Sequence, residues 1–461
     1  MVGLNNLGNT CYLNSVLQCL IATNSLVVYL FDDVFIEECR NTFIKKKDNL
    51  DETISSQNLH TNSEKRLLSQ KSMIPQESSA FDETISNKND ITIRLKSFVC
   101  IHLYEIMKYA YNNDNQKTIS PSQFYKLMGK KHDIFNGNDQ NDSHEILNFI
   151  LHDIIDEVKT NTNFLDDIQI SKSFKKFIET KNDFEKIFKY FNDIKTTSKT
   201  HSESINNIFK NYPHLSTCLE NINETKKIYS HYIKNNNYFV IMYNSHVYLK
   251  KFFHNNYSPI HKIFSGLYCF STTCLHCDKS VFLYEPFLSI SLPIKNDENE
   301  TSLNYCLDNF LKGEYLSNNN KYKCNECKEY SNAHKKIYIL KKPDVLVFHL
   351  KRFFHVNKKI SKNKNIVHFP IENLIIKNTL FEEYMDADID DENVVLFYNL
   401  YAIICHLGTI DSGHYISFCK NIQNGKWYSY DDDNVEEIDI ETLQKNIVMK
   451  TVFLLFYQNN L

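Results

Sequence analysis

The sequence is poor in the residues and runs that define several specialised classes of protein. Its 461 residues include 9 glycines, 8 prolines and one tryptophan, too little glycine and proline for a collagen-like or a Gly/Pro-rich disordered chain. No apolar run approaches the eighteen or so residues that a membrane span needs. The N-terminus lacks the charged and apolar regions of a signal peptide. We therefore expect a soluble globular protein that is cytoplasmic or nuclear and is not secreted.

An excess of either charge is also missing, because 52 basic residues stand against 56 acidic ones. A protein that binds nucleic acid or an anionic membrane surface normally carries a clear basic excess. Neither partner is therefore expected. The 13 cysteines form an odd number, and in a reducing compartment cysteines stay thiols or bind metal.

Hydrophobic patterning predicts an α+β fold. Residues 1–160 show helical spacing, interrupted by a polar, aperiodic and flexible insertion at about 41–90. A Lys- and Asn-rich insertion at 161–256 is expected to be partly helical, and the acidic run Glu382–Glu392 to be a solvated loop. The C-terminal half holds strand-like runs separated by turn residues. These runs are Phe287–Ile294, Ile337–Leu340, Val345–Leu350, Leu396–Cys405, Tyr415–Phe418, Lys426–Tyr430 and Val452–Tyr457.

Apolar spacing also predicts a buried helix that begins near Thr10, with Cys11 in its first turn. The peptide N–H groups at the start of a helix stabilise negative charge, which favours the thiolate that nucleophilic catalysis needs. Asn6, five residues upstream, could donate an N–H group to an oxyanion. Cys11 is therefore the candidate nucleophile, and the alternative is an ordinary buried core cysteine.

The candidate base is His414, at the start of a predicted strand. If Asn421–Asn424 form a four-residue hairpin loop, antiparallel pairing places His414 opposite Asp431, on the same face of the sheet. A carboxylate there would hold the imidazole in one tautomer. A two-residue turn would instead place Asp431 opposite Phe418. Another alternative is that the acidic run at 431–433 is only a solvated turn.

Two Cys-x-x-Cys pairs lie 46 residues apart. Each pair can offer two thiolates to one metal ion, and four thiolates complete a tetrahedral zinc site with no open position. The predicted zinc is therefore structural rather than catalytic, and redox activity of the pairs is the alternative. The four predicted ligands are Cys274, Cys277, Cys324 and Cys327.

Taken together, these segments resemble the motifs of the ubiquitin-specific proteases, in the order of that family. Gly3–Leu20 is similar to the family's Cys box, and Tyr398–Tyr430 to its His box. Between them, Gln140–Glu145, the two cysteine pairs and Pro343–Phe353 also resemble family motifs. The resemblance covers residues 3 to 457 apart from the two insertions.

The resemblance implies a papain-like cysteine protease with thumb, palm and zinc-stabilised fingers subdomains. The whole chain, 1–461, would then be one catalytic domain. Its thumb would lie within 1–160, its fingers at 257–342 and its palm at 343–461, with the partly helical insertion at 161–256 between thumb and fingers.

The resemblance also implies roles for individual residues. Cys11 would be the nucleophile, His414 the general base and acid, Asp431 the orienting acid and Asn6 the oxyanion donor. Three thumb residues resemble those that grip the C-terminal tail of ubiquitin, and the alternative for them is a solvated helix start. They are Gln140, Asp142 and Glu145.

The function implied is that of a deubiquitinating cysteine protease that hydrolyses the isopeptide or peptide bond after the terminal glycine of ubiquitin. Several segments are closest to a subgroup activated by WD-repeat partners that bind the fingers. Two alternatives remain. One is a ubiquitin-binding scaffold that needs a partner for activity, and the other is a protease for a ubiquitin-like modifier.

Overall fold

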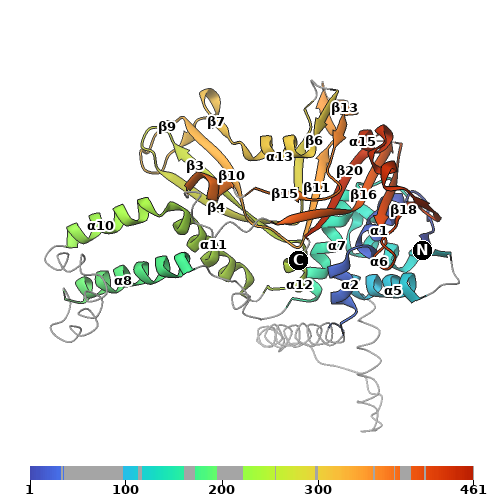
Figure 1. The fold of residues 1–461 in the computed structure, drawn as a ribbon, viewed down its shortest axis with the longest axis horizontal. Coiled ribbons are helices and arrows are strands. Elements are labelled where there is room, and N and C mark those ends of the chain that lie inside the picture. The colour runs from blue at the N-terminus through green and yellow to red at the C-terminus, as the bar shows by residue number, and fades with distance from the viewer. Residues whose placement is uncertain are drawn as a thin grey trace, which may run out of the picture.

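A computed structural model describes most of the chain outside two long segments. The described residues are 1–32, 35, 97–112, 117–159, 172–194, 222–254, 256–295, 299–356, 359–377, 379–384, 396–409 and 412–459. The insertion predicted at about 41–90 lies outside them. Figure 1 shows the arrangement, with one end of the molecule formed by helices packed on a large sheet and the other by a smaller sheet and long helices.

Helices from the first third of the chain pack around a buried central helix, α1, whose every residue is buried. The prediction that this helix begins near Thr10 is confirmed. Among the described residues, no single helix is long and apolar enough to cross a membrane, and α1 with α2 passes that test only as a pair bent by 80°. The helices at this end are α1 (Cys11–Ile21), α2 (Asn24–Leu30), α5 (Val99–Asn112), α6 (Ser122–Lys131), α7 (Ser143–Glu157) and α12 (Pro259–Phe264).

The large sheet has the strand order β19-β18-β17-β16-β20-β11-β5, and β15 also pairs with β16. Helix α1 lies against β17, so the helix start and the strand start that the sequence singled out meet here. The strands are β5 (Ile290–Pro293), β11 (Val345–Lys351), β15 (Leu374–Ile375), β16 (Phe397–Gly408), β17 (Gly413–Lys420), β18 (Trp427–Asp431), β19 (Asn434–Ile438) and β20 (Val452–Asn459).

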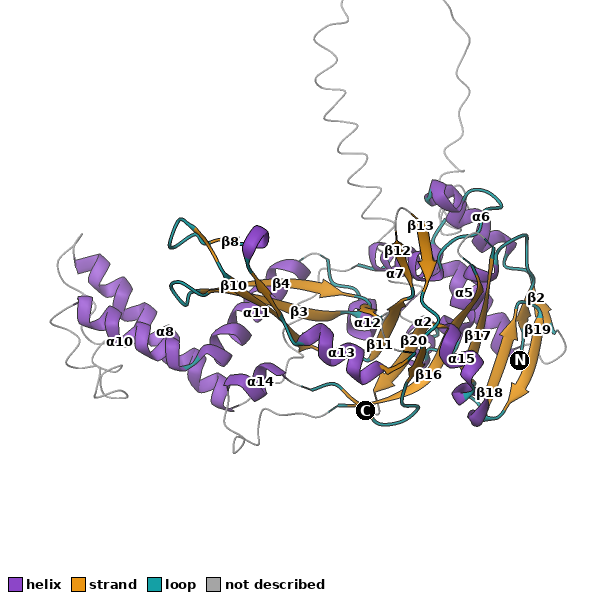
Figure 2. Cartoon of the chain, turned by 90° about the horizontal axis from the view of Figure 1, so that it is seen from above, coloured by secondary structure: helices purple, strands orange, loops and turns teal. Residues whose placement is uncertain are grey.

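A smaller sheet, ordered β4-β3-β10-β7, extends away from the large one (Figure 2). The first cysteine pair lies at the end of β3 and in the turn after it, and the second pair lies in the turn of a neighbouring two-stranded hairpin. Its elements are β3 (Gly266–Cys274), β4 (Ser280–Phe287), β7 (Glu314–Leu316), β10 (Ala333–Lys341) and, beside them, the hairpin β8 (Tyr322–Lys323) with β9 (Tyr330–Ser331) and helix α13 (Leu303–Leu311).

The insertion at 161–256 is partly helical, as predicted. It contributes α8 (Lys172–Ile194), α10 (Ile222–Asn235) and α11 (Asn237–Phe253). Together with α14 (Thr379–Tyr384), these helices pack aromatic side chains on one face of the smaller sheet, where Cys269 and Tyr338 are buried. The described helices of the insertion therefore contribute to the core at this end of the molecule.

Two details differ from the sequence-based expectation. The acidic run Glu382–Glu392 begins inside α14 rather than in a loop, and Glu383, although exposed, accepts hydrogen bonds from Tyr338 Oη at 2.8 Å and from Lys336 Nζ. The run from residue 385 onward lies outside the described residues. The turn between β17 and β18 has six residues, not four, because Lys420 pairs with Trp427. Hydrogen bonds from two loop amides to the side chain of Asn421 stabilise the longer turn.

The remaining elements are short and join the two ends. They are the parallel pair β1 (Gly3–Leu4) with β2 (Thr118–Ile119), the hairpin β12 (Phe353–Val356) with β13 (Lys359–Lys362), the pair β14 (Ile366–His368) with β6 (Glu300–Ser302), helix α15 (Asn446–Thr451), and 3-10 turns at Asp133–Phe135, Asn318–Asn320 and Ile440–Gln444.

Candidate active site

Cys11 is the first residue of α1 and is 4% exposed. The carbonyl of Thr10 accepts the amides of Leu13 and Asn14, both at 3.0 Å, so the amides of residues 11 and 12 belong to the open first turn. The helix start therefore surrounds the thiol with partial positive charge. Because the rest of α1 is packed in the core, this position of the sulfur is fixed by burial.

His414, near the start of β17, lies between Cys11 and Asp431. Its Nε2 is 2.6 Å from Asp431 Oδ1. A hydrogen bond with Cys11, and then the one with Asp431, raises the pKa of His414 to about 9, against the opposing effect of burial. Because Asp431 engages Nε2, Nδ1 is the ring nitrogen that remains for the interaction with Cys11. The imidazolium form of His414 is the one that this arrangement favours.

The six-residue turn changes how His414 meets Asp431. Ser417 pairs with Tyr430, so the ladder places the two strands two residues out of the predicted register. A shift by two keeps every side chain on its own face. The predicted neighbours therefore still meet, as a diagonal pair where the ladder ends rather than as a directly opposed pair.

Asp432 is a second carboxylate of the site that the sequence argument passed over. Its Oδ2 accepts from Asn6 Nδ2 at 2.7 Å, and its Oδ1 accepts from Asn14 Nδ2 at 2.8 Å. Its backbone has φ of +52°, and its carboxylate lies within 4.8 Å of both the His414 ring and the Asp431 carboxylate. The signal available in the sequence was only its position beside Asp431.

The segment before α1 lies against the same turn. Leu4 donates its amide to the Asp432 carbonyl at 2.8 Å. Gly3 packs so closely that a Cβ there would stand 2.4 Å from the Asp433 carbonyl oxygen. The Asn6 side-chain oxygen accepts from the amides of Gly8 and Thr10 at 2.9 and 3.2 Å. These contacts fix the Asn6 amide next to the start of α1.

The three predicted thumb residues lie at the start of α7 but do different things. Asp142 is the helix N-cap and accepts from the amide of His144 at 2.6 Å; burial raises its pKa. Gln140 Oε1 accepts from the amide of Gly413 at 2.8 Å, one residue before His414. Glu145 is exposed. Asp142 thus matches the helix-start alternative as well as a binding role.

A stacked histidine pair joins α7 to the large sheet beside these residues. The rings of His144 and His349 lie 4.1 Å apart at 23°, and each ring faces a serine hydroxyl. Burial, then neighbouring positive charge, lowers the pKa of His144 to about 4 and that of His349 to about 3. Both rings are therefore neutral at physiological pH.

The four predicted metal ligands come together at the end of the smaller sheet. Cys274 Sγ lies 3.9 Å from Cys327 Sγ, and Cys277 Sγ lies 3.8 Å from Cys324 Sγ. All four sulfur atoms lie within 4.8 Å of one another. The two pairs lie in two turns of the same kind. In each turn, the fourth residue after the first cysteine donates its amide to that cysteine's carbonyl at 2.9 Å. This cluster of thiols could hold one metal ion.

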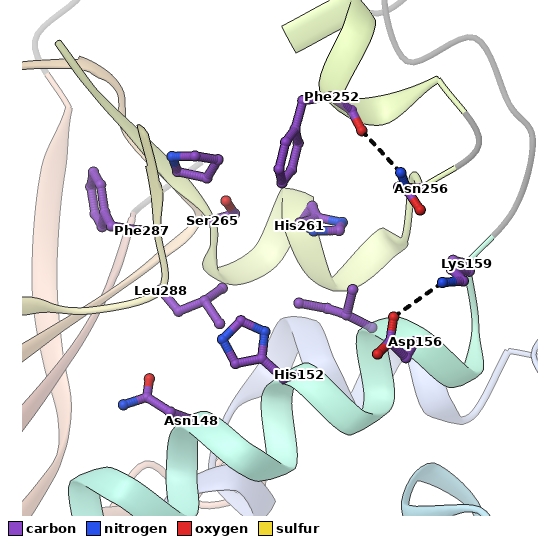
Figure 3. Close-up of a pocket in the computed structure, with 12 residues that line it drawn as sticks. Asn148, His152, Asp156, Lys159, Phe252, Asn256, His261, Ser265, Phe287 and Leu288 are labelled. Atoms are coloured by element: carbon purple, nitrogen blue, oxygen red, sulfur yellow. Dashed lines mark hydrogen bonds and ion pairs between the residues drawn. The ribbon is translucent and has the colours of Figure 1, made fainter. Parts of the chain in front are cut away.

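A separate pocket of about 440 Å³ lies between α7, α11, α12 and β4 (Figure 3). Phe252, Phe287 and Leu288 give it apolar walls, and the ion pair of Asp156 with Lys159 closes one side. None of the candidate catalytic residues lines it.

A helix-borne thiol beside a strand-borne, carboxylate-oriented histidine defines a papain-like cysteine hydrolase. Comparison with known families then gives the particular group. Residues 2–457 match the ubiquitin carboxyl-terminal hydrolase family, and the chain belongs to that family. It is therefore a thiol-dependent hydrolase of the deubiquitinating class.

Individual relatives agree with this assignment. A probable ubiquitin carboxyl-terminal hydrolase of Acanthamoeba polyphaga mimivirus is 27% identical over 478 residues, covering 99% of this chain and 90% of the relative. Ubiquitin carboxyl-terminal hydrolase 2 of Homo sapiens is 23% identical over 461 residues, and the chain spans 55% of its length. The family and activity class predicted from the sequence motifs are confirmed.

Solved structures support the fold. A SAGA Ubp8/Sgf11/Sus1/Sgf73 DUB module bound to ubiquitin aldehyde matches with a TM-score of 0.53 and 22% identity, covering 100% of this chain and 70% of that one. The mixed helix and sheet architecture predicted for the chain is confirmed at this level. The predicted likeness to the subgroup activated by WD-repeat proteins stays a prediction.

Proposed function

We propose that Cys11, His414 and Asp431 hydrolyse the bond after the C-terminal glycine of ubiquitin. The observation that carries the proposal is the position of His414, whose Nε2 lies 2.6 Å from Asp431 Oδ1 and whose pKa is raised by its interactions with Cys11 and Asp431. In this scheme the Cys11 thiolate attacks the carbonyl carbon and forms a thioester. His414 protonates the leaving amine and then takes a proton from the water that cleaves the thioester.

Asn6 and the amide of Cys11 are the proposed oxyanion donors. A side-chain amide nitrogen carries two N–H groups, so Asn6 can hold Asp432 with one and donate toward the oxyanion with the other. Asp432 would then fix the direction of the second N–H group before substrate arrives. Such preorganised donors contribute about 3 kcal/mol each in related acyl-transfer enzymes.

Ubiquitin is the proposed substrate because of the family and of the acidic thumb. Asp142 and Glu145 would meet basic side chains of an extended C-terminal tail, while Gln140 already contacts the loop that carries His414. A structural neighbour is a complex with ubiquitin aldehyde. We assign the selection of ubiquitin chains and of protein substrates to surfaces away from this site.

A structural zinc ion is the proposed occupant of the four-cysteine cluster. Four thiolates satisfy tetrahedral zinc completely, and the cluster is far along the chain from the catalytic residues and on a different sheet. Cys274 and Cys324 are buried, so the thiols would be held in place by the folded turns. The ion would stabilise the turns and take no part in the hydrolysis.

Two further expectations stand as proposals. A reducing compartment, the cytoplasm or nucleus, suits a protein whose nucleophile and metal ligands all need free thiols. A WD-repeat activator at the smaller sheet is proposed on the sequence likeness alone; it would have to use the face or end that α11 and α14 leave uncovered.

Hydrolysis of ubiquitin that carries a fluorogenic C-terminal amide tests the proposed function. The full chain should release the fluorophore, Cys11→Ala should not, and Cys19→Ala should keep the wild-type rate. Cys19 is a matched control because it is a buried thiol of the same helix. Turnover of another modifier in place of ubiquitin, or turnover by Cys11→Ala, would overturn the proposal.

A further inference from the structure

Lys362, the last residue of β13, is half-buried and directs its ammonium group at the hairpin that carries His414. Its Nζ donates to the carbonyls of His406 and Gly408, at 2.6 and 3.0 Å, and to His406 Nδ1 at 2.9 Å. An ammonium group has three N–H donors. All three are therefore used on one short stretch of β16.

The two carbonyls lie on either side of Leu407, which pairs with His414 in the β16–β17 ladder. The facing ends of these two strands lie close together. Gly408 has φ of +82°, and a Cβ there would stand 2.4 Å from the carbonyl oxygen of Ser412. Lys362 thus holds the strand segment that directly supports the catalytic histidine.

The third contact passes through a buried imidazole. Because Lys362 donates to Nδ1 of His406, the proton of the neutral ring must lie on Nε2. Burial, then Lys362 and His414, lowers the pKa of His406 to about 4, which keeps that ring neutral. His406 Nε2 in turn lies against Gly413, where a Cβ would stand only 2.0 Å from it. The ring therefore fills the space beneath the residue that precedes His414.

We infer that Lys362 is a positioning residue for catalysis, which fixes the β16–β17 hairpin and with it the direction of the His414 ring toward Cys11. Lys362 lies on β13, which pairs with β12 in a hairpin separate from the large sheet. It therefore links the β12–β13 hairpin to the strand that pairs with the catalytic histidine. The inference rests on the proposed roles of Cys11 and His414, but not on the identity of the modifier.

The titratable groups that face Lys362 are His406 and, by charge, Arg352, Lys364 and Cys405. Burial, then the charges of Arg352 and Lys364, lowers the pKa of Lys362 to about 8. The ammonium form is therefore only moderately favoured, and its carbonyl contacts help to retain the proton. Experiments on this residue should cover pH 6 to 10.

Two measurements on the full chain test the inference. The first gives kcat and KM with the fluorogenic ubiquitin amide, and the second gives the rate of Cys11 alkylation by iodoacetamide against pH. Lys362→Met should lower kcat about tenfold or more with little change in KM, and should move the alkaline limb of the alkylation profile to lower pH. Lys362→Arg keeps a cation and its N–H donors. It should therefore show a smaller loss of kcat and a smaller shift of the alkylation profile than Lys362→Met.

Lys341→Met is the matched control, because Lys341 also donates to two backbone carbonyls, those of His261 and Ser265. It should lower the melting temperature and leave kcat per folded molecule and the alkylation profile unchanged. The same pattern in Lys362→Met would overturn the inference. Should Lys362→Met not fold, Gly408→Ala disturbs the same hairpin from its other side, and wild-type kinetics in that variant would also contradict the inference.

Failure of the proposed substrate is distinguishable from failure of this inference. If the wild-type chain does not hydrolyse ubiquitin but Cys11 alkylation still depends on His414, the modifier is wrong and the alkylation profile of Lys362→Met still decides the role of Lys362.

Discussion

The two cysteine-based sites of this protein are built in opposite ways. At the catalytic end, one thiol acts with His414 and Asp431, and hydrogen bonds between distant segments hold these groups in place. At the end of the smaller sheet, four thiols lie in two turns of the same local geometry. The first site depends on contacts between distant segments for its orientation, and the second is formed by two local turns that bring four thiols together.

This difference explains how far each site could be predicted. The turns of the cysteine cluster are local, so the spacing of the four residues was enough to find them. The catalytic contacts cross the molecule, and only the resemblance joined Cys11 to His414 before the structure did. Asp432 was missed because its partners, Asn6 and Asn14, are more than 400 residues away in sequence.

The largest expected effect is the loss of activity without loss of stability when the catalytic cysteine is removed. Cys11→Ala should reduce turnover of the ubiquitin amide by roughly a millionfold, as removal of a nucleophile does elsewhere, while the melting temperature stays near that of the wild type. Steady-state kinetics and a thermal melt on the same sample check this. A large loss of stability would mean that Cys11 is chiefly a core residue.

Cys324→Ser should show the reverse pattern. Structural zinc sites contribute on the order of 10 kcal/mol of binding free energy that is coupled to folding, so the variant should give much less folded protein. The molecules that do fold should turn over at close to the wild-type rate. Soluble yield and the rate per titrated active site measure the two effects, and normal yield with lost turnover would contradict the structural role.

Asp431→Ala should lower kcat by about a hundredfold to ten-thousandfold, because the imidazole loses the carboxylate that fixes its tautomer. It should also lower the pKa of His414. Asp432→Ala should act through Asn6 instead and leave the alkaline limb of the pH profile where it is. Rate profiles of both variants, with circular dichroism to establish folding, separate an orienting acid from a support of the oxyanion donor.

The pH dependence of the wild type follows from the raised pKa of His414. The imidazolium is favoured below about pH 9, so kcat/KM should fall as the pH rises through that value. The stabilisation from the imidazolium is complete below about 6.5, the ordinary histidine pKa, and is lost as the pH rises through about 9. A profile with no alkaline limb between pH 8 and 10 would contradict the pairing with Cys11.

The smallest effect concerns the stacked His144 and His349, whose pKa values are lowered in the folded state. The unfolded chain binds protons below about pH 6.5 and the folded pair does not, so stability is complete above that pH and falls as the pH drops toward 4. Urea midpoints at pH 7.5 and 5.5 measure the fall. His349→Gln should make it shallower, and an unchanged pH difference would exclude this pair as its source.

Much of the fold was accessible from the sequence, for reasons that particular elements make plain. The apolar spacing of α1 and the runs of β11, β16 and β20 are strong because those elements are buried. The β17–β18 turn was given too few residues because nothing in its sequence shows that the Asn421 side chain would bond loop amides. The contacts of the exposed Glu383 with β10 were not foreseen because Tyr338 and Lys336 are distant from it in sequence.

The most direct test of the account uses ubiquitin that carries a thiol-reactive group at its C-terminus. The purified, zinc-loaded chain should form a covalent adduct, peptide mapping should place the bond on Cys11, and Cys11→Ala should form none while Cys19→Ala reacts normally. An adduct at any other cysteine, or no adduct from folded protein, would contradict the assignment of Cys11 as the nucleophile of a deubiquitinating enzyme.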